Sequence, residues 1–328
     1  MSIAFPERHA LAHLPTPIEK LERLSQLLEG PEIYIKRDDL TGIGKTGNKV
    51  RKLEFLVAEA LREEAQILIT CGGLQSNHAR ATALTAAKVG IKSHLVLRDS
   101  AGSDIDGNLF IDRLVGAEVT SIIPQEYEQV DDIMQRLADD YAKQGVKAYV
   151  IPEGGSTALG ALGYALAIEE AGRQMKAMRM EFDHIISAVG SGGTLAGMLL
   201  GKSAYGLKAQ IHGINVCDDA PYFQERISNI MREAKRRFGF EISLQKKDID
   251  IIDGYVGKGY GLSRQEEIEL IKLVARTEGV ILDPIYTAKA MFGLRDQIRK
   301  GRFAKQEKVL FWHTGGIFGL FPKRGLFF

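Results

Sequence analysis

The chain has 328 residues, of which 45% are hydrophobic and 26% charged, and its 43 basic and 42 acidic side chains give a net charge of +1. This length is enough for a large core and two lobes, and the even charge balance gives no electrostatic basis for binding nucleic acid or an anionic membrane. No apolar stretch approaches the roughly 18 residues of a membrane span. Glu7, Arg8 and His9 stand where a signal peptide would be apolar, so we expect a cytoplasmic protein.

Short apolar runs rich in β-branched residues alternate with longer amphipathic runs along the chain. This alternation predicts an α/β fold with mostly parallel sheets and helices on both faces. The strands are too many for one comfortable sheet, so two lobes are expected. The predicted strands are 33–36, 67–70, 93–97, 119–123, 148–151, 185–189, 211–216, 281–282 and 309–312, and the main predicted helices are 77–89, 129–144, 162–173, 195–202, 222–238 and 264–277.

The residues that commonly bind metals form no metal-site pattern. Cys71 and Cys217 lie far apart in sequence and form neither a disulfide framework nor a zinc pattern. We expect two reduced, buried thiols. The seven histidines do not include the zinc motif His-Glu-x-x-His. No metal is therefore predicted.

Lys49 stands at the start of an amphipathic helix, just after a glycine-bearing turn, Thr46-Gly47-Asn48. The N-terminus of a helix attracts anions. A cofactor that joins an aldehyde to a phosphate would suit this place, because the amine can form a Schiff base while nearby backbone N–H groups hold the charge. The apolar residues that recur at helical spacing after the lysine are Leu53, Leu56, Val57, Ala60 and Leu61.

A glycine-rich loop, Gly190-Ser191-Gly192-Gly193-Thr194, lies between a predicted strand and a predicted helix. Glycines allow backbone N–H groups to approach an anion, and the helix dipole adds to the attraction. Leu195 replaces the last glycine of a dinucleotide-binding motif, and the chain has no Walker loop. A tight turn without function would have the same sequence, but together with Lys49 and Asn77 we favour a phosphate site.

Ser76-Asn77-His78 lies at a second turn from strand to helix. Serine and asparagine are preferred at the N-cap, so a purely structural role is one interpretation and is compatible with a functional one. His78 is either a packing residue or a neighbour of a bound ring.

Two further segments lie near the C-terminus, Leu282-Asp283-Pro284-Ile285-Tyr286-Thr287 and Phe311-Trp312-His313-Thr314-Gly315-Gly316. Together with the segments around Lys49, Ser76 and Gly190, they resemble the pyridoxal-phosphate enzymes of the tryptophan-synthase-β-like fold. Within that group the chain is most similar to the D-cysteine desulfhydrase / 1-aminocyclopropane-1-carboxylate (ACC) deaminase family, from about Thr16 to about Gly316. One difference is Thr46, where the family usually has glycine, so the backbone there must suit a β-branched residue.

The resemblance implies a fold of type II with pyridoxal 5'-phosphate in a cleft between two lobes. It assigns residues 1–51 and 161–328 to a large lobe and residues 52–160 to a small inserted lobe, and it implies a homodimer. The implied catalytic residues are Lys49, which carries the cofactor, Ser76, which contacts the substrate carboxylate, Tyr286 and Tyr260. The implied cofactor-binding residues are Lys49, Lys52, Asn77 at the ring hydroxyl, Gly190, Ser191, Gly192, Gly193, Thr194, Thr287 and Thr314, the last at the pyridine nitrogen.

Thr287 and Thr314 also bear on the substrate. ACC deaminases of this family have Glu and Leu at these two positions, and a buried Glu would keep the pyridine nitrogen protonated and strengthen the electron sink. Elimination of a substituent from the β-carbon requires a weaker electron sink than the opening of a cyclopropane ring, which has no leaving group. The two threonines therefore resemble the D-cysteine desulfhydrase side of the family. ACC, L-cysteate, D-serine and β-chloro-D-alanine remain alternative substrates, and an anion-binding α/β protein without catalysis is the alternative from another class.

Overall fold

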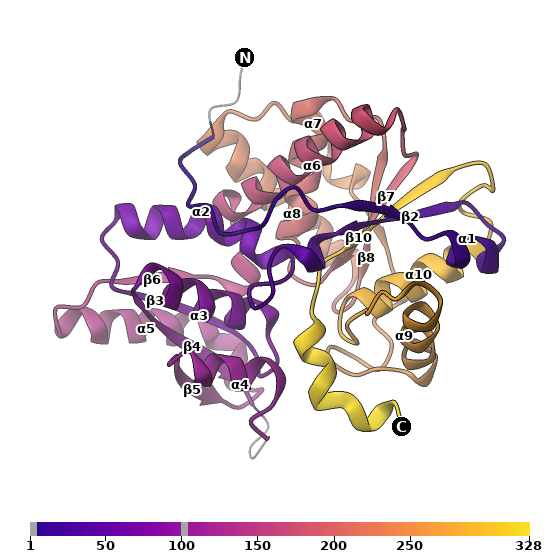
Figure 1. Ribbon diagram of the computed structural model, residues 1–328. Coiled ribbons are helices and arrows are strands. Elements are labelled where there is room, and N and C mark those ends of the chain that lie inside the picture. Colours follow the sequence, from indigo (N-terminus) through magenta and orange to yellow (C-terminus); the bar gives the residue numbers. More distant parts are fainter. Residues whose placement is uncertain (1–4, 100–103) are drawn as a thin grey trace.

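The computed structural model describes residues 5–99 and 104–328, which form two sheets with helices on both faces of each (Figure 1). The larger sheet has the order β1-β2-β10-β7-β8-β9, in which β1 alone is antiparallel to its neighbour. The smaller sheet has four parallel strands in the order β5-β4-β3-β6. The predicted α/β class with mostly parallel sheets is therefore confirmed.

The strands are β1 (Ile18–Lys20), β2 (Glu32–Arg37), β3 (Ile67–Gly73), β4 (Lys92–Arg98), β5 (Glu118–Ile122), β6 (Ala148–Ile151), β7 (His184–Val189), β8 (Gln210–Asn215), β9 (Asp250–Ile252) and β10 (Lys308–His313). The helices are α1 (Glu22–Leu28), α2 (Asn48–Arg62), α3 (Asn77–Val89), α4 (Gly107–Leu114), α5 (Val130–Lys143), α6 (Ala158–Met178), α7 (Gly193–Tyr205), α8 (Ala220–Phe238), α9 (Gln265–Glu278) and α10 (Thr287–Arg299). Two 3-10 segments matter for the site, η3 (Glu153–Gly155) and η5 (Ile317–Leu326).

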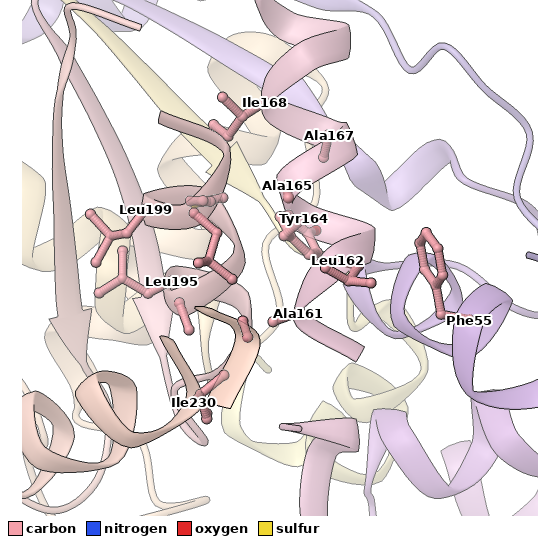
Figure 2. Close-up of a cluster of buried hydrophobic side chains, with 14 of the residues drawn as sticks. Phe55, Ala161, Leu162, Tyr164, Ala165, Ala167, Ile168, Leu195, Leu199 and Ile230 are labelled. Atoms are coloured by element: carbon pink, nitrogen blue, oxygen red, sulfur yellow. The ribbon is translucent and has the colours of Figure 1, made fainter. Parts of the chain in front are cut away.

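The larger sheet is covered by α2, α6, α7 and α8 on one face and by α1, α9 and α10 on the other. Figure 2 shows α6 with its alanines and leucines between neighbouring helices. The helices approach closely because small residues face one another: a Cβ on Gly163 would lie 2.2 Å from the carbonyl oxygen of Arg51, and one on Gly197 would lie 2.2 Å from that of Ala161. This packing holds α2, the helix that begins with Asn48 and Lys49, in a fixed position.

In the smaller sheet α5 packs against one face, and α3 with α4 packs against the other. Its four strands fall between Ile67 and Ile151, within the segment for which the sequence predicts an inserted lobe. The proposed lobe boundaries near residues 52 and 160 stay a prediction. Among the described residues, no helix is long and apolar enough to cross a membrane.

The predicted strand at 281–282 is wrong. Leu282 is fully buried in the core between α9 and α10, but it forms no strand. Pro284 follows two residues later and has no N–H to donate to a ladder. Conversely, β1 and β9 were not predicted, because each has three residues and so is too short to show an alternating pattern.

Candidate active site

A cavity of about 680 Å³, counting its open mouth, lies where strands of both sheets end. The chain enters its wall at Gly72, near the end of β3, and at Gly190, directly after β7. Parallel sheets commonly bind ligands at the carboxyl ends of their strands. The predicted site residues that line the cavity are Lys49, Ser76, Asn77, Gly190, Ser191, Gly192, Thr194, Tyr260, Tyr286 and Thr314. Lys52, Gly193 and Thr287 are not among the lining residues.

The turn before Lys49 is built against the segment that follows β10. Gly47 has a φ of +104°, and a Cβ there would lie 2.6 Å from the carbonyl oxygen of Thr314, so only glycine fits. The amide of Asn48 donates to the same carbonyl oxygen at 3.1 Å. Thr46 needs no left-handed backbone and its hydroxyl donates to the carbonyl of Asp39. The replacement of a glycine by Thr46 is therefore compatible with the turn.

The amine of Lys49 lies at the cavity, and its one hydrogen bond to a described residue is a long one of 3.4 Å to the carbonyl oxygen of Gly154. Burial lowers the pKa of Lys49 to about 8, while the charge of Glu153 raises it and that of Arg226 lowers it further. A lysine in this state is partly neutral near neutral pH. It can therefore act as a nucleophile and as a proton acceptor.

Lys52 and His78 are buried nitrogen-bearing side chains close to Lys49. The Lys52 amine donates to the carbonyl oxygen of Gly154 at 3.1 Å and to the Ser156 hydroxyl at 3.3 Å. Burial and then the charge of Lys49 hold the pKa of both Lys52 and His78 well below its ordinary value. Both ring nitrogens of His78 are buried and have no hydrogen-bond partner among the described residues. Buried nitrogen groups without counter-charges suit an anionic ligand, because its charge would favour their protonated forms.

The glycine-rich loop presents backbone amides at the N-terminus of α7. Within the described part of the chain, no partner accepts a hydrogen bond from the amides of Ser191, Gly192 or Thr194. The loop is held from outside, because Arg226 donates to the carbonyl oxygen of Ser191 at 3.0 Å and the hydroxyls of Ser191 and Ser156 lie 2.8 Å apart. Unpaired amides at a helix N-terminus are a suitable site for a phosphate group.

Ser76 is the N-cap of α3, as its sequence position predicts. Its Oγ accepts hydrogen bonds from the amides of His78 and Ala79, both at 3.2 Å. Asn77 lies beside it, and its Oδ1 accepts from the Nδ2 of Asn108 at 3.1 Å. Both side chains line the cavity, so the capping role is compatible with a role toward a ligand.

Tyr260 and Tyr286 meet at the cavity, with their hydroxyl oxygens 2.6 Å apart. Tyr260 comes from the glycine-rich segment before α9, and Tyr286 from the turn before α10. Burial raises the pKa of Tyr260 to about 12 and that of Tyr286 still further above its ordinary value. Both hydroxyls therefore stay protonated at neutral pH.

The two threonines of the predicted site occupy different environments. Thr314 lines the cavity, and its hydroxyl has no hydrogen-bond partner among residues 5–99 and 104–328. Thr287 is fully buried at the start of α10, where its hydroxyl donates to Oδ1 of Asp283 at 2.8 Å. Asp283 also accepts from the amide of Thr287 at 2.7 Å, so Thr287 belongs to the support of this turn.

A buried ionic cluster behind the Lys49 turn was not predicted. Asp38 is fully buried and accepts hydrogen bonds from Arg51 at 2.8 and 2.9 Å, from Tyr164 at 2.6 Å and from Trp312 at 2.8 Å. Arg51 also donates to Glu170. The cluster joins the turn to α2, α6 and β10. Tyr164 lies 126 positions after Asp38 in the sequence, and Trp312 lies 274 positions after it. The lone sequence signal was Asp38 directly after a strand.

The cysteines take no part in the cavity lining. Cys71 is buried in β3, and burial raises the pKa of its thiol to about 12. Cys217 donates to the carbonyl oxygen of Gly190 at 3.5 Å, and burial raises its pKa too. Within the described residues, no group of three histidine, cysteine or acidic side chains could hold a metal ion.

These features fit pyridoxal phosphate. The Lys49 amine, the free amides of the 190–194 loop and the nearby Lys52 amine suit an aldehyde and a phosphate in one cavity. Asn77 and Thr314 place further polar groups on the cavity wall. Glycines keep the cavity open, because a Cβ on Gly154 would lie 2.4 Å from the Ser191 hydroxyl and 3.1 Å from the Lys49 amine.

Comparisons with known proteins agree. Residues 10–315 match the family described as "Pyridoxal-phosphate dependent enzyme". The chain is 44% identical over 324 residues, 96% of its own length and 79% of the relative's, to "Bifunctional D-cysteine desulfhydrase/1-aminocyclopropane-1-carboxylate deaminase, mitochondrial" of Arabidopsis thaliana. It is 41% identical over 314 residues, 93% of this chain and 92% of the other, to "D-cysteine desulfhydrase" of Yersinia pestis (strain Pestoides F).

A solved structure extends this agreement to three dimensions. The crystal structure of an "ACC deaminase homologue" superposes with a TM-score of 0.90 at 38% identity and covers 98% of this chain and 95% of its own. The resemblance inferred from Lys49, the glycine-rich loop and the C-terminal motifs is confirmed. The chain belongs to the family of pyridoxal-phosphate-dependent enzymes.

Proposed function

We propose that the protein is a pyridoxal-phosphate-dependent D-cysteine desulfhydrase, which converts D-cysteine and water to pyruvate, ammonia and hydrogen sulfide. The observation that carries the proposal is the cavity position of Thr314, whose hydroxyl is free. Glu153 is the one carboxylate among the described lining residues, and it lies beside Lys49. A neutral hydroxyl at the ring suits elimination of a good leaving group from the β-carbon. The relatives named as D-cysteine desulfhydrases support this substrate.

The residues would divide the work as follows. Bound pyridoxal phosphate would supply an electron sink for the electron pair that remains on the α-carbon of the substrate when its proton is removed. Lys49 accepts that proton at its Nζ, because its lowered pKa leaves part of the amine neutral. Ser76 would hold the substrate carboxylate, and Asn77 would donate to the ring oxygen. The Tyr260–Tyr286 pair would donate a proton toward the departing sulfur.

The first test is spectroscopic. We expect the purified protein to be yellow and expect borohydride to bleach this absorbance, after which peptide mapping should find the cofactor on Lys49. A label on Lys36, Lys45 or Lys52 would overturn the assignment. A colourless protein that binds no pyridoxal phosphate would favour an anion-binding protein without catalysis.

The second test compares substrates at equal concentration. Sulfide and pyruvate should appear from D-cysteine far faster than 2-oxobutyrate appears from ACC. ACC deamination is the second candidate function, because the Arabidopsis relative and the solved homologue carry ACC deaminase in their names. Equal or faster turnover of ACC would select it, and sulfite release from L-cysteate without D-cysteine turnover would select a sulfo-lyase.

We further propose a cytoplasmic homodimer. Exposed apolar side chains on α4 and on η5, two elements that pack together, support a self-association surface: Phe110, Leu114, Phe321 and Leu326 are 47–70% exposed. Sedimentation of the wild-type protein and of a Phe110→Ser/Leu114→Ser variant tests this, and a monomeric wild-type protein would contradict it. Free Cys71 and Cys217 suit a reducing compartment, which cell fractionation tests.

A further inference from the structure

Arg80 is a buried cation that contacts three segments around the site, of which Asn77 lines the cavity. It lies on α3, one turn beyond Asn77, and has no exposed surface. Its Nη2 donates to the carbonyl oxygen of Thr46 at 2.7 Å, in the turn that leads to Lys49. Its Nη1 donates to Oδ1 of Asn108 at 2.8 Å and, at a longer 3.4 Å, to Oδ1 of Asn77.

These contacts determine which way two amides point. A guanidinium group can only donate hydrogen bonds, so Asn108 must turn its oxygen toward Arg80. The Nδ2 of Asn108 then faces two acceptors, the carbonyl oxygen of Gln75 at 2.8 Å and Oδ1 of Asn77 at 3.1 Å. Asn77 must therefore turn its own oxygen toward Asn108, which leaves its Nδ2 as the free end of the amide.

The free end of Asn77 lies beside Gly316, and the residue itself lines the cavity. Its Nδ2 is 3.0 Å from the place that a Cβ on Gly316 would occupy, and Asn77 lines the cavity although it is only 8% exposed. Without Arg80 and Asn108, either end of the amide could face the cavity with similar energy, because the oxygen and nitrogen ends have nearly the same shape.

We propose that Arg80 is a positioning residue that acts through Asn108 to make Asn77 a hydrogen-bond donor toward the cavity. This rests on the proposed function, since the acceptor would be the ring oxygen of pyridoxal phosphate. An oxyanion gains from an N–H donor and is repelled by a carbonyl oxygen. Arg80 has a second effect through its hydrogen bond to the carbonyl oxygen of Thr46. This bond couples the orientation of Asn77 to the turn that carries Lys49.

The sharpest test is Asn108→Asp, because it replaces the N–H end of this amide by an oxygen and keeps the shape of the side chain. It also removes the donor to the carbonyl oxygen of Gln75. The new carboxylate still accepts from Arg80 and adds an ion pair, but it offers no N–H to Asn77. The Asn77 amide then turns its N–H inward and its oxygen toward the cavity. We expect the dissociation constant of pyridoxal phosphate, measured by titration of the apoprotein, to rise roughly ten- to hundredfold.

The absorbance of the bound cofactor gives an independent reading. An oxyanion that has lost its donor holds a nearby proton more tightly, so the midpoint of the pH titration of the absorbance should move upward by about 1 unit. Arg80→Lys keeps the charge but not the fork of donors, and it should shift the midpoint in the same direction. Ala83→Gly is the matched control: it weakens the same helix and removes no contact of Asn77.

The outcomes are separable. If both Asn108→Asp and Arg80→Lys bind and titrate like Ala83→Gly, Arg80 has a structural role only and the proposal is wrong. If Arg80→Lys does not fold, Asn108→Asp decides by itself. If the wild-type protein binds no pyridoxal phosphate, the proposed function itself is wrong. If the wild-type protein and the variants bind it equally well, only the role of Arg80 is wrong.

Discussion

The hydroxyl oxygens of Tyr260 and Tyr286 lie 2.6 Å apart, and each hydroxyl has a single proton. One tyrosine must donate its hydroxyl proton to the hydroxyl oxygen of the other, so the pair has one O–H left to donate into the cavity. The two rings come from segments 26 residues apart and meet nearly edge to face at 69°. The pair therefore acts as one donor whose direction both residues fix.

This arrangement predicts that the two tyrosines are not independent. Tyr286→Phe and Tyr260→Phe should each lower kcat for D-cysteine by roughly a hundredfold, the usual range for losing a positioned proton donor. The double variant should lose little more than the worse single variant, because the same donor is removed. Cofactor absorbance should stay unchanged in all three variants. Losses of kcat that multiply in the double variant would show two separate roles.

Ser76 and Asn77 should separate in their effects. Ser76→Ala removes the N-cap of α3 and should cost about 1 kcal/mol of stability, while kcat/KM falls roughly ten- to hundredfold because the substrate carboxylate loses a donor. Asn77→Ala should shift the absorbance before substrate is added. Asp219→Ala, which removes the exposed N-cap of α8, is the control for capping alone. If Ser76→Ala and Asp219→Ala behave alike, Ser76 is only a cap.

The lysine titration gives a pH prediction. Burial lowers the pKa of Lys49 to about 8, and the charge of Glu153 raises it. The neutral amine therefore accumulates as the pH rises through 8, and the rate at which the apoprotein takes up pyridoxal phosphate should rise with it. Glu153→Gln removes the raising charge and should move the midpoint to lower pH, whereas Glu128→Gln, an exposed position, should not. A midpoint near the ordinary lysine value would contradict the assigned burial.

Asp112 should make stability depend on pH. Its carboxylate oxygens are buried without a hydrogen-bond partner among the described residues, and burial raises its pKa to about 7 although Arg80 opposes this. The unfolded chain ionises near pH 4, so Asp112 favours folding at low pH and loses this contribution between pH 4 and 7. Asp112→Asn should therefore raise the free energy of unfolding at pH 8 by roughly 1 to 3 kcal/mol.

The check is thermal unfolding at two pH values. The gain in Tm of Asp112→Asn over the wild-type protein should be present at pH 8 and should shrink toward pH 5. Asp139→Asn, at an exposed position of α5, should show no such trend. A constant difference in Tm across this range would mean that Asp112 is not the group that titrates.

The sequence predicted the parts of this protein that depend on local pattern. The strands around Ile69 and Ile186 and the helix of Asn77–Val89 show clear apolar periods, and the structure contains β3, β7 and α3 there. Lys49 and the loop at Gly190 could be identified because each lies in a glycine-bearing turn between a strand and a helix, a pattern visible within a few residues of sequence. The positions of these motifs could be predicted because turns of this kind depend on local backbone geometry, which nearby residues largely determine.

The contacts that support the site could not be predicted in the same way. Asp38 meets Trp312 although 274 residues separate them, and nothing in the sequence near either residue indicates the other. The same holds for Arg80 and Thr46, 34 residues apart. Thr287 was expected at the cofactor but is not among the cavity lining, because its hydroxyl is bonded to Asp283 four residues earlier. Such pairings depend on how the helices and sheets pack.

The close approach of Gly47 to Gly315 has a consequence for biosynthesis. A Cβ on Gly315 would lie 2.6 Å from the Cα of Gly47, and β10 runs between β2 and β7. The wall behind Lys49 therefore consists of two segments that are synthesised far apart in time. Nascent chains that end before residue 308 have the lysine but not the strand that fixes its turn, so cofactor capture must await the synthesis of β10.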